Sequence, residues 1–430
     1  MGKSTCFHLP NTNLMGVGSL SNLGKELVAL GYKKALIVTD KNLVKLGHVG
    51  KVEQILKDNN IAYTIFDGVE RPNPNVTFVE NGYKYIQDER NKAISPTYDF
   101  VISVGGGSNH DTARSIAALA TNGGSIVNYE GSNKFTKPIL PWVAVNTTAG
   151  SGAHVTMFNI ITDDSRKTAM TISDPKLLAT LTVDDPELQL SMPREVTISS
   201  GIDVLAHAVE AYVALNATPF TDALALGAIK LVFNNLKRVA VNGNDLETRE
   251  NMAYATDMAA TAFNNAGLGH THTIAHQIDG ASYRHHGLTT GALLPYVLEF
   301  NAPSIPVQRF IDMAIAMGET GVTGFNAVET VLTAIRKFNE TLGIPTDLSE
   351  LGAKDEDIKY YAEMALKDIS GSANPRQATL EDMIQLIRTC MGVESSQKPG
   401  WEQDKQFDPI AMLANNAERL SANDLNVDRT

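Results

Sequence analysis

The N-terminal half of the chain alternates short apolar runs with helical stretches, and this alternation restricts the fold more than any other feature. The apolar run KKALIVTD, which begins at Lys33, precedes the helical stretch VEQILKDNN, and the apolar run AYTIFDGV follows it. The same order continues through FVENGYKYIQDE, YDFVISVGGG and PILPWVAVN. Strands that alternate with helices of this length are typical of βαβ units. We therefore expect an α/β N-terminal domain with a Rossmann-like, doubly wound parallel sheet over roughly residues 1–190.

The pattern changes near Met192. Segments such as TISSGIDVLAHAVEAYVAL and LETRENMAYATDMAATAF have helical periodicity and few β-branched runs, which predicts an all-α C-terminal domain. A chain of 430 residues exceeds what one core usually holds. We expect one domain over residues 1–191, a second over 192–392, and a polar C-terminal extension over 393–430. Thr379, followed by Glu381 and Asp382, predicts the start of a last helix.

Composition narrows the class of partner. The formal net charge is −12 and no run of Lys or Arg stands out, which argues against nucleic acid and anionic membranes. Cys6 and Cys390 are the only cysteines, so no disulfide framework is expected. The N-terminus does not resemble a signal peptide, and no segment approaches 18 uninterrupted apolar residues. We expect a cytoplasmic protein that acts on a small molecule.

A glycine-rich turn follows the apolar run VISV. Gly105, Gly106, Gly107 and Ser108 precede a helix expected to start near Asp111. Glycines let a ligand approach the backbone closely, and the N–H groups at a helix start form a seat for phosphate. The turn is therefore a candidate pyrophosphate site, although a tight strand-to-helix turn uses glycines equally well. Its spacing departs from the G-x-G-x-x-G fingerprint.

Two further segments place polar groups where predicted strands end. Asp40 ends the strand LIVTD, at the sheet edge where doubly wound folds bind ligands. A carboxylate there can accept hydrogen bonds from a ribose and repel a 2′-phosphate, which favours NAD over NADP. A helix N-cap is an equally good interpretation of Asp40. The loop NTTAGSG offers the hydroxyls of Thr147 and Thr148.

Half of the ten histidines lie between residues 270 and 286: His270, His272, His276, His285 and His286. Such density suggests a metal site or proton chemistry, because imidazole is a common metal ligand and titrates near neutral pH. His272 and His276 are four residues apart, so a helix places them on one face. His285 and His286 stand directly before Gly287, and we expect them on a loop that closes over the site.

The segment GIDVLAHAVEAY repeats this spacing with Asp203 and His207. Two helices can therefore direct an Asp/His pair and a His/His pair toward each other. One such pair alone is more often a solvated helix face or a hydrogen-bonded core histidine. The combination of two pairs with a third group of histidines favours a metal centre.

Four motifs occur together in one order: GGGSNHD, TTAGSG, GIDVLAHAVEAY and AGLGHTHTIAHQ. In this order and separation they resemble the iron-dependent (group III) alcohol dehydrogenases, and they look closest to the NAD-dependent methanol and 1,3-propanediol dehydrogenases within that family. The resemblance covers roughly residues 7–391. It implies reversible hydride transfer between a short primary alcohol or diol and NAD, one divalent metal per subunit, and a homo-oligomer of two or more chains. Fe(II) is the favoured metal, while Zn(II) or another divalent ion also suits three imidazoles and a carboxylate.

The resemblance also implies roles for individual residues. The metal ligands would be Asp203, His207, His272 and His286. His276 would lie beside the nicotinamide and substrate rather than bind the metal, and it is the candidate proton relay, with His270 or His285 as possible partners. The cofactor contacts would be Asp40, Asn73, Gly105, Gly106, Gly107, Ser108, Asp111, Thr147, Thr148 and Lys167.

Several positions depart from the family pattern without loss of an implied ligand: Arg114, Ala153-His154, Thr271, the segment from Asp279 to Ser282, and Thr290-Gly291. Such changes bear on substrate preference and turnover, because residues around the ligands set ligand orientation. Two other functions are compatible with the fold. A dehydroquinate-synthase-like lyase needs a Lys/Arg-rich pocket, and only Arg284 stands near the histidine motifs. A non-catalytic binding or assembly protein is the other alternative.

Overall fold

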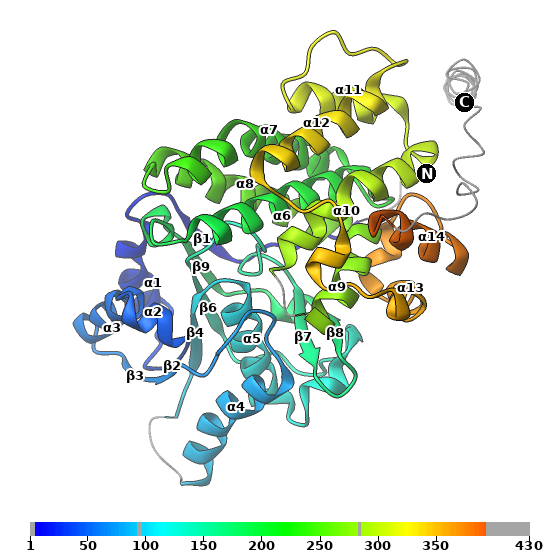
Figure 1. Ribbon diagram of the computed structural model, residues 1–430. Coiled ribbons are helices and arrows are strands. Elements are labelled where there is room, and N and C mark those ends of the chain that lie inside the picture. The colour runs from blue at the N-terminus through cyan, green and yellow to red at the C-terminus, as the bar shows by residue number, and fades with distance from the viewer. Residues whose placement is uncertain (1–4, 93–96, 283–284, 393–430) are drawn as a thin grey trace, which may run out of the picture.

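The main sheet has six parallel strands in the order β1-β9-β6-β4-β2-β3. In chain order these are β1 (Thr12–Met15), β2 (Lys34–Val38), β3 (Ala62–Phe66), β4 (Phe100–Gly105), β6 (Trp142–Asn146) and β9 (Leu181–Asp184). They belong to a computed structural model that describes residues 5–92, 97–282 and 285–392. Figure 1 shows the sheet and its helices beside a separate group of helices. The predicted parallel sheet is confirmed.

Alternating side chains of the central strands enter two different cores. Leu36 and Val38 of β2 pack with α4 (Val76–Asn91) and α5 (Gly107–Asn122), whereas Ala35 and Ile37 pack with α1 (Leu23–Ala29) and α3 (His48–Asp58). A strand covered by helices on both faces has a nearly continuous apolar run, as residues 35–38 (ALIV) of β2 do after the half-buried Lys34. The doubly wound arrangement is therefore confirmed. The short helix α2 (Lys41–Lys45) begins where β2 ends.

The strands of a second, three-stranded sheet lie between β4 and β9 along the chain. It contains β5 (Gly131–Ser132), β7 (Phe158–Asp163) and β8 (Thr168–Ser173), and β7 and β8 form an antiparallel hairpin. The sequence pattern did not predict this hairpin. It packs against the helical part so closely that a Cβ at Gly280 would lie 3.0 Å from the Ala169 nitrogen.

Every named helix after Arg194 belongs to the second part of the fold, and the strands of the described residues all end before it. The helices are α6 (Arg194–Val213), α7 (Pro219–Val241), α8 (Leu246–Ala266), α9 (His270–Ser282), α10 (His286–Asn301), α11 (Val307–Ala316), α12 (Ala327–Leu342), α13 (Ile358–Ala365) and α14 (Leu380–Cys390). In Figure 1, α6 runs through the middle of this group. Its residues are buried almost all round, so polar side chains on α6 face other protein groups rather than water.

Three predicted boundaries can be compared with the structure. Thr379 and Asp382 form a capping box at the start of α14, which confirms the predicted last helix. The helix expected near Asp111 begins earlier, at Gly107, with Gly106 as its N-cap. The expected loop is wrong for His286, which is the first residue of α10, whereas His285 precedes the helix as its N-cap. The expected extension, 393–430, lies outside the described residues, and no described helix is long and apolar enough to cross a membrane.

Candidate metal centre and dinucleotide site

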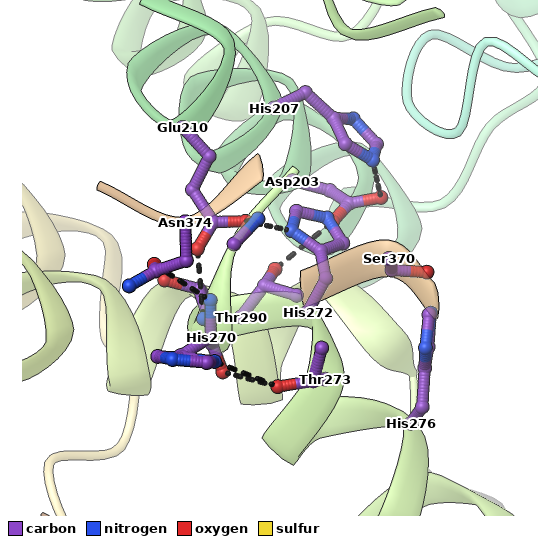
Figure 2. A network of polar contacts seen from close by, with 12 residues as sticks. Asp203, His207, Glu210, His270, His272, Thr273, His276, Thr290, Ser370 and Asn374 are labelled. Atoms are coloured by element: carbon purple, nitrogen blue, oxygen red, sulfur yellow. Dashed lines mark hydrogen bonds and ion pairs between the residues drawn. The ribbon is translucent and has the colours of Figure 1, made fainter. Parts of the chain in front are cut away.

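Three helices bring one carboxylate and three imidazoles together. The carboxylate is Asp203 of α6, and its Oδ2 lies 3.9 Å from Nε2 of His207, one turn further along the same helix. Its Oδ1 lies 3.8 Å from Nε2 of His272 on α9 and 3.9 Å from Nε2 of His286 on α10. The four implied metal ligands therefore converge. Figure 2 shows Asp203 and His207 on one helix and His272 approaching from another.

Close helix packing makes this convergence possible. Asp203 and His207 are four residues apart on α6, and both side chains are buried. At the start of α10, a Cβ on Gly287 would lie 1.8 Å from the Ser199 oxygen of α6. Only glycine lets the two helices approach this closely, and the approach carries the adjacent His286 to the cluster.

Carboxylates behind two of the imidazoles hold them in place. Nδ1 of His272 lies 2.6 Å from Oε2 of Glu210, and Nδ1 of His286 lies 2.6 Å from Oδ2 of Asp279. A carboxylate accepts the proton of Nδ1 in each ring, so whenever the ring is neutral its Nε2 lone pair points toward Asp203. Within the described residues, Nε2 of His272 is buried and has no hydrogen-bond partner. An unpartnered buried nitrogen is costly unless a ligand such as a cation satisfies it.

The sequence analysis missed Glu210 and did not recognise what Asp279 and Thr290 do. Glu210 lies three residues after His207, and it also accepts hydrogen bonds from the backbone N–H groups of Gly269 (2.9 Å) and Thr271 (2.7 Å). The Thr290 hydroxyl donates to Oδ1 of Asp203 at 2.9 Å. The signal for Glu210 was its spacing, since positions 203, 207 and 210 share one face of a helix.

The electrostatics of the cluster suit a cation. Burial raises the pKa of the Asp203 carboxyl, but the three facing imidazoles and Thr290 outweigh burial and hold that pKa below its usual value. Burial lowers the pKa of His207 to about 3, so this imidazole is neutral at pH 7. Burial also lowers the pKa of His286, but Asp203 and Asp279 outweigh burial and raise this pKa to about 9. A divalent ion would have to displace the proton that His286 otherwise holds.

His276 lies next to this cluster. Its ring stacks on that of His286 with centroids 5.4 Å apart, and its Nδ1 lies 2.6 Å from Oδ2 of Asp368. Asp368 in turn accepts a hydrogen bond from the Ser370 backbone at 2.9 Å. The carboxylate thus orients the imidazole. His270 lies elsewhere on α9, where its ring packs 6.5 Å from that of Phe300.

A small cavity lies next to Asp368 in the chain, because Ile369 and Ser370 are among its lining residues. The other lining residues are Ser132, Phe158, Ser173, Gly267, Leu268 and Ser372. The Phe158 ring lies 6.1 Å from that of Phe263, which stacks on His207 at 4.4 Å. The cavity combines hydroxyl groups with apolar surface, which suits a small ligand that is itself partly polar.

The predicted cofactor loops meet at the carboxyl edge of the main sheet. Gly105 adopts a φ of +150°, and Gly106 is so close to the next loop that a Cβ there would lie 2.9 Å from the Thr148 side chain. The Thr147 nitrogen donates to the Gly105 oxygen at 3.0 Å. The glycine turn and the threonine loop therefore form one surface. The turn also contains Gly107 and Ser108 at the start of α5.

Asp40 and Asp111 take part in hydrogen bonds within the protein. Asp40 caps α2 by accepting from the Asn42 and Leu43 nitrogens, which confirms the N-cap interpretation, and its Oδ2 accepts from Asn109 at 3.0 Å. Asp111 is buried and pairs with Arg114, the residue that departs from the family pattern. These contacts fix both carboxylates near the glycine turn.

Asn73 and Lys167, the two remaining predicted cofactor contacts, both adopt left-handed backbone angles, with φ of 57° and 54°. Asn73 is half-buried, and Lys167 is exposed in the turn between β7 and β8. Neither belongs to the main sheet.

Comparison with known proteins identifies relatives over nearly the whole described chain. The model of iron-containing alcohol dehydrogenases matches residues 10–186, and the model of the C-terminal part of the Fe-containing alcohol dehydrogenase family matches residues 197–391. The NAD-dependent methanol dehydrogenase of Bacillus methanolicus is 40% identical over 389 residues, which is 90% of this chain and 100% of that protein. The 1,3-propanediol dehydrogenase of Klebsiella pneumoniae is 40% identical over 384 residues, 88% of this chain and 97% of that protein.

Solved structures agree with these matches. A 1,3-propanediol oxidoreductase structure superposes with a TM-score of 0.85 at 39% identity, and the alignment covers 90% of this chain and 100% of that one. A sulfoacetaldehyde reductase from Bifidobacterium kashiwanohense, in complex with NAD+, superposes with a TM-score of 0.77 at 25% identity, covering 91% of this chain and 100% of that one.

Proposed function

Because the chain belongs to the iron-containing alcohol dehydrogenase family, we propose that it is an alcohol dehydrogenase that transfers hydride reversibly between a short primary alcohol or diol and NAD. The observation that carries this proposal is the convergence of three imidazole nitrogens on the Asp203 carboxylate at 3.8–3.9 Å. The relatives named for methanol and 1,3-propanediol support the substrate class. The small cavity whose lining residue Ser370 donates its backbone N–H to Asp368 is our proposed alcohol site.

We propose Asp203, His207, His272 and His286 as the ligands of one divalent ion, with Fe(II) favoured by the family and Zn(II) as an alternative. The unpartnered Nε2 of His272 supports this assignment. When bound, the ion supplies Lewis acidity that makes an alcohol more acidic, and the dinucleotide supplies the hydride acceptor. Glu210 and Asp279 keep two imidazoles directed at the ion, and Thr290 holds the carboxylate.

The proposed NAD site lies on the surface formed by Gly105, Gly106, Gly107 and Ser108 with Thr147 and Thr148. The start of α5 favours a pyrophosphate there, because the helix dipole and backbone N–H groups attract an anion. The Asp40 carboxylate at the same edge would repel a 2′-phosphate, which favours NAD over NADP. Asn73, Asp111 and Lys167 remain proposed contacts. The relative whose structure contains NAD+ supports the choice of dinucleotide.

We propose His276 as the group that moves the alcohol proton toward solvent, with Asp368 orienting its ring. The proposed domains are the dinucleotide-binding part at 1–191, the helical metal-binding and catalytic part at 192–392, and the C-terminal extension at 393–430. A cytoplasmic location, assembly as a homo-oligomer and the absence of nucleic-acid and membrane partners are further proposals. The net charge of −12 supports the last of them.

A substrate panel tests the proposal. The chain is purified anaerobically, its metal content is measured, and samples with Fe(II), with Zn(II) or with a chelator are mixed with NAD and short primary alcohols or diols. We expect NADH to accumulate in the metal-containing samples and not in the chelated one. Tight NAD binding without NADH formation from any alcohol would favour the non-catalytic alternative and overturn the proposal.

A further inference from the structure

A second buried cluster of ionisable groups lies where the main sheet meets α8. It contains His154 from the loop after β6, Asp184 at the end of β9 and Asp257 of α8, and their side chains are 1–5% exposed. One nitrogen or oxygen from each of the three lies within 4.8 Å of the other two. The proposed metal and cofactor sites do not use these residues.

Neighbouring amides hold one oxygen of each carboxylate. Nε2 of His154 lies 2.7 Å from Oδ1 of Asp257, whose Oδ2 accepts from Asn13 at 2.8 Å. Oδ1 of Asp184 accepts from Asn146 at 2.8 Å and from Gln189 at 3.1 Å. Within the described residues, Oδ2 of Asp184 and Nδ1 of His154 are buried and have no hydrogen-bond partner. The cluster therefore leaves one oxygen and one nitrogen unsatisfied.

The charges of the cluster indicate that a proton can satisfy Oδ2 of Asp184. Burial lowers the pKa of His154, but Asp257 outweighs burial and raises it, so His154 and Asp257 form an ion pair. Burial and the Asp257 charge raise the pKa of Asp184 to about 7. Three other ionisable groups face the cluster: His110, Arg114 and Tyr254 of α8. The His110 ring lies 5.8 Å from that of His154, and Arg114 pairs with Asp111. A proton on Asp184 leaves the cluster neutral, whereas a metal ion would have to break the His154–Asp257 bond.

Asn146 connects Asp184 with the threonine loop. The Asn146 amide nitrogen that donates to Asp184 also donates to the Thr148 oxygen at 2.7 Å. In return, the Thr148 nitrogen donates to Oδ1 of Asn146 at 3.3 Å. A displacement of the Asp184 carboxylate therefore reaches the backbone of the proposed dinucleotide loop through a single side chain.

We propose that the cluster of His154, Asp257 and Asp184 positions the Thr147–Thr148 loop for NAD, and that the proton on Asp184 determines how firmly the loop is held. The inference rests on the proposed function, because it needs the dinucleotide to contact this loop. With the proton present, Asp184 carries no charge beside the Asp257 carboxylate, one oxygen of which lies within 4.8 Å of an Asp184 oxygen. Once the proton is lost, two carboxylates face each other in a buried place, and their repulsion displaces Asp184 and Asn146.

The test measures the Kd of NAD by calorimetry at several pH values between 6 and 8.5, on the metal-containing full-length chain. For the wild type, we expect the Kd to rise with pH by roughly three- to tenfold, the effect of one hydrogen bond. Asp184→Asn keeps an oxygen for Asn146 and places an amide donor at Oδ2, so it mimics the protonated carboxyl. The Kd of this variant is expected to stay near the low-pH value of the wild type throughout.

Asp174→Asn is the matched control, because Asp174 is also fully buried but accepts from Lys176 and Phe135 instead. It should keep the pH dependence of the wild type. A flat wild-type profile, or an Asp184→Asn variant that keeps the wild-type slope, overturns the inference. So does a second metal equivalent per chain that Asp184→Asn removes, because the cluster would then hold a cation. A wild type that binds no NAD at any pH refutes the proposed cofactor itself, which is a different result.

Discussion

Replacement of Glu210 by glutamine is expected to weaken metal binding without removing any ligand. Oε2 of Glu210 accepts from both Nδ1 of His272 and the Gly269 nitrogen, and Oε1 accepts from the Thr271 nitrogen. A glutamine can keep only one acceptor oxygen, so its amide group must face at least one of these donors. If that donor is Nδ1 of His272, the ring changes tautomer, Nε2 becomes protonated and its lone pair is no longer available to a metal.

The size of the effect follows from the contacts that change. Loss of such an orienting group typically costs about 10- to 100-fold in metal affinity or activity, which corresponds to ~1.4–2.7 kcal/mol. The buried donor left without an acceptor lowers the free energy of unfolding by about 1–3 kcal/mol. Glu89→Gln is the matched control, because Glu89 is also a buried glutamate with an ion-pair partner, Lys34, but it lies on α4 in the α/β part.

Metal retention is the direct assay. Wild type, Glu210→Gln and Glu89→Gln are dialysed against a series of chelator concentrations, bound metal is measured by elemental analysis, and unfolding is followed by circular dichroism. Glu210→Gln should lose metal at lower chelator concentrations and form NADH more slowly, while Glu89→Gln should lose only stability. If Glu210→Gln retained metal and activity at wild-type levels, the assigned role of the carboxylate in orienting His272 would be wrong.

Three further changes test other parts of the molecule. His272→Ala should remove bound metal and turnover but leave the circular dichroism spectrum unchanged, and retention of both metal and activity would contradict the ligand assignment. Asp40→Gly should relax discrimination against NADP, measured as the ratio of KM values for the two dinucleotides. Asp40→Ser removes the charge but keeps the cap, because serine can still cap α2. An unchanged ratio of the two KM values in both variants would exclude the proposed repulsion between Asp40 and the 2′-phosphate. Thr379→Ala removes the capping box of α14 and should lower the free energy of unfolding by about 1 kcal/mol with metal content unchanged, a prediction that chemical denaturation can refute.

The fold was predictable because short apolar runs alternate with helical stretches over a long part of the sequence. The run ALIV in β2 is apolar because helices cover both faces of the strand, and the alternation of such runs with helices is visible in the chain. The hairpin of β7 and β8 was missed although its six-residue strands are as long as β4, and its contact with Gly280 of α9 forms only in the folded chain. The error at His286 has a similar cause, since α10 begins where Gly287 can lie against α6.

Residue types and helical spacing in the chain pointed to the pairs Asp203 with His207 and His272 with His276, and they suggested the chemistry of a divalent ion. The choice of His286 as a ligand in place of His276 came from the resemblance to the family. The spacing of residues in the sequence indicates which side chains share one face of a helix. It does not indicate how far apart two helices lie. The orienting roles of Glu210, Asp279 and Thr290, and the pairing of His154 with Asp257, arise from residues 7–103 positions apart that meet only after packing. Long-range contacts of this kind are decided by the folded arrangement, because the side chains involved have no local partner that would reveal them in the sequence.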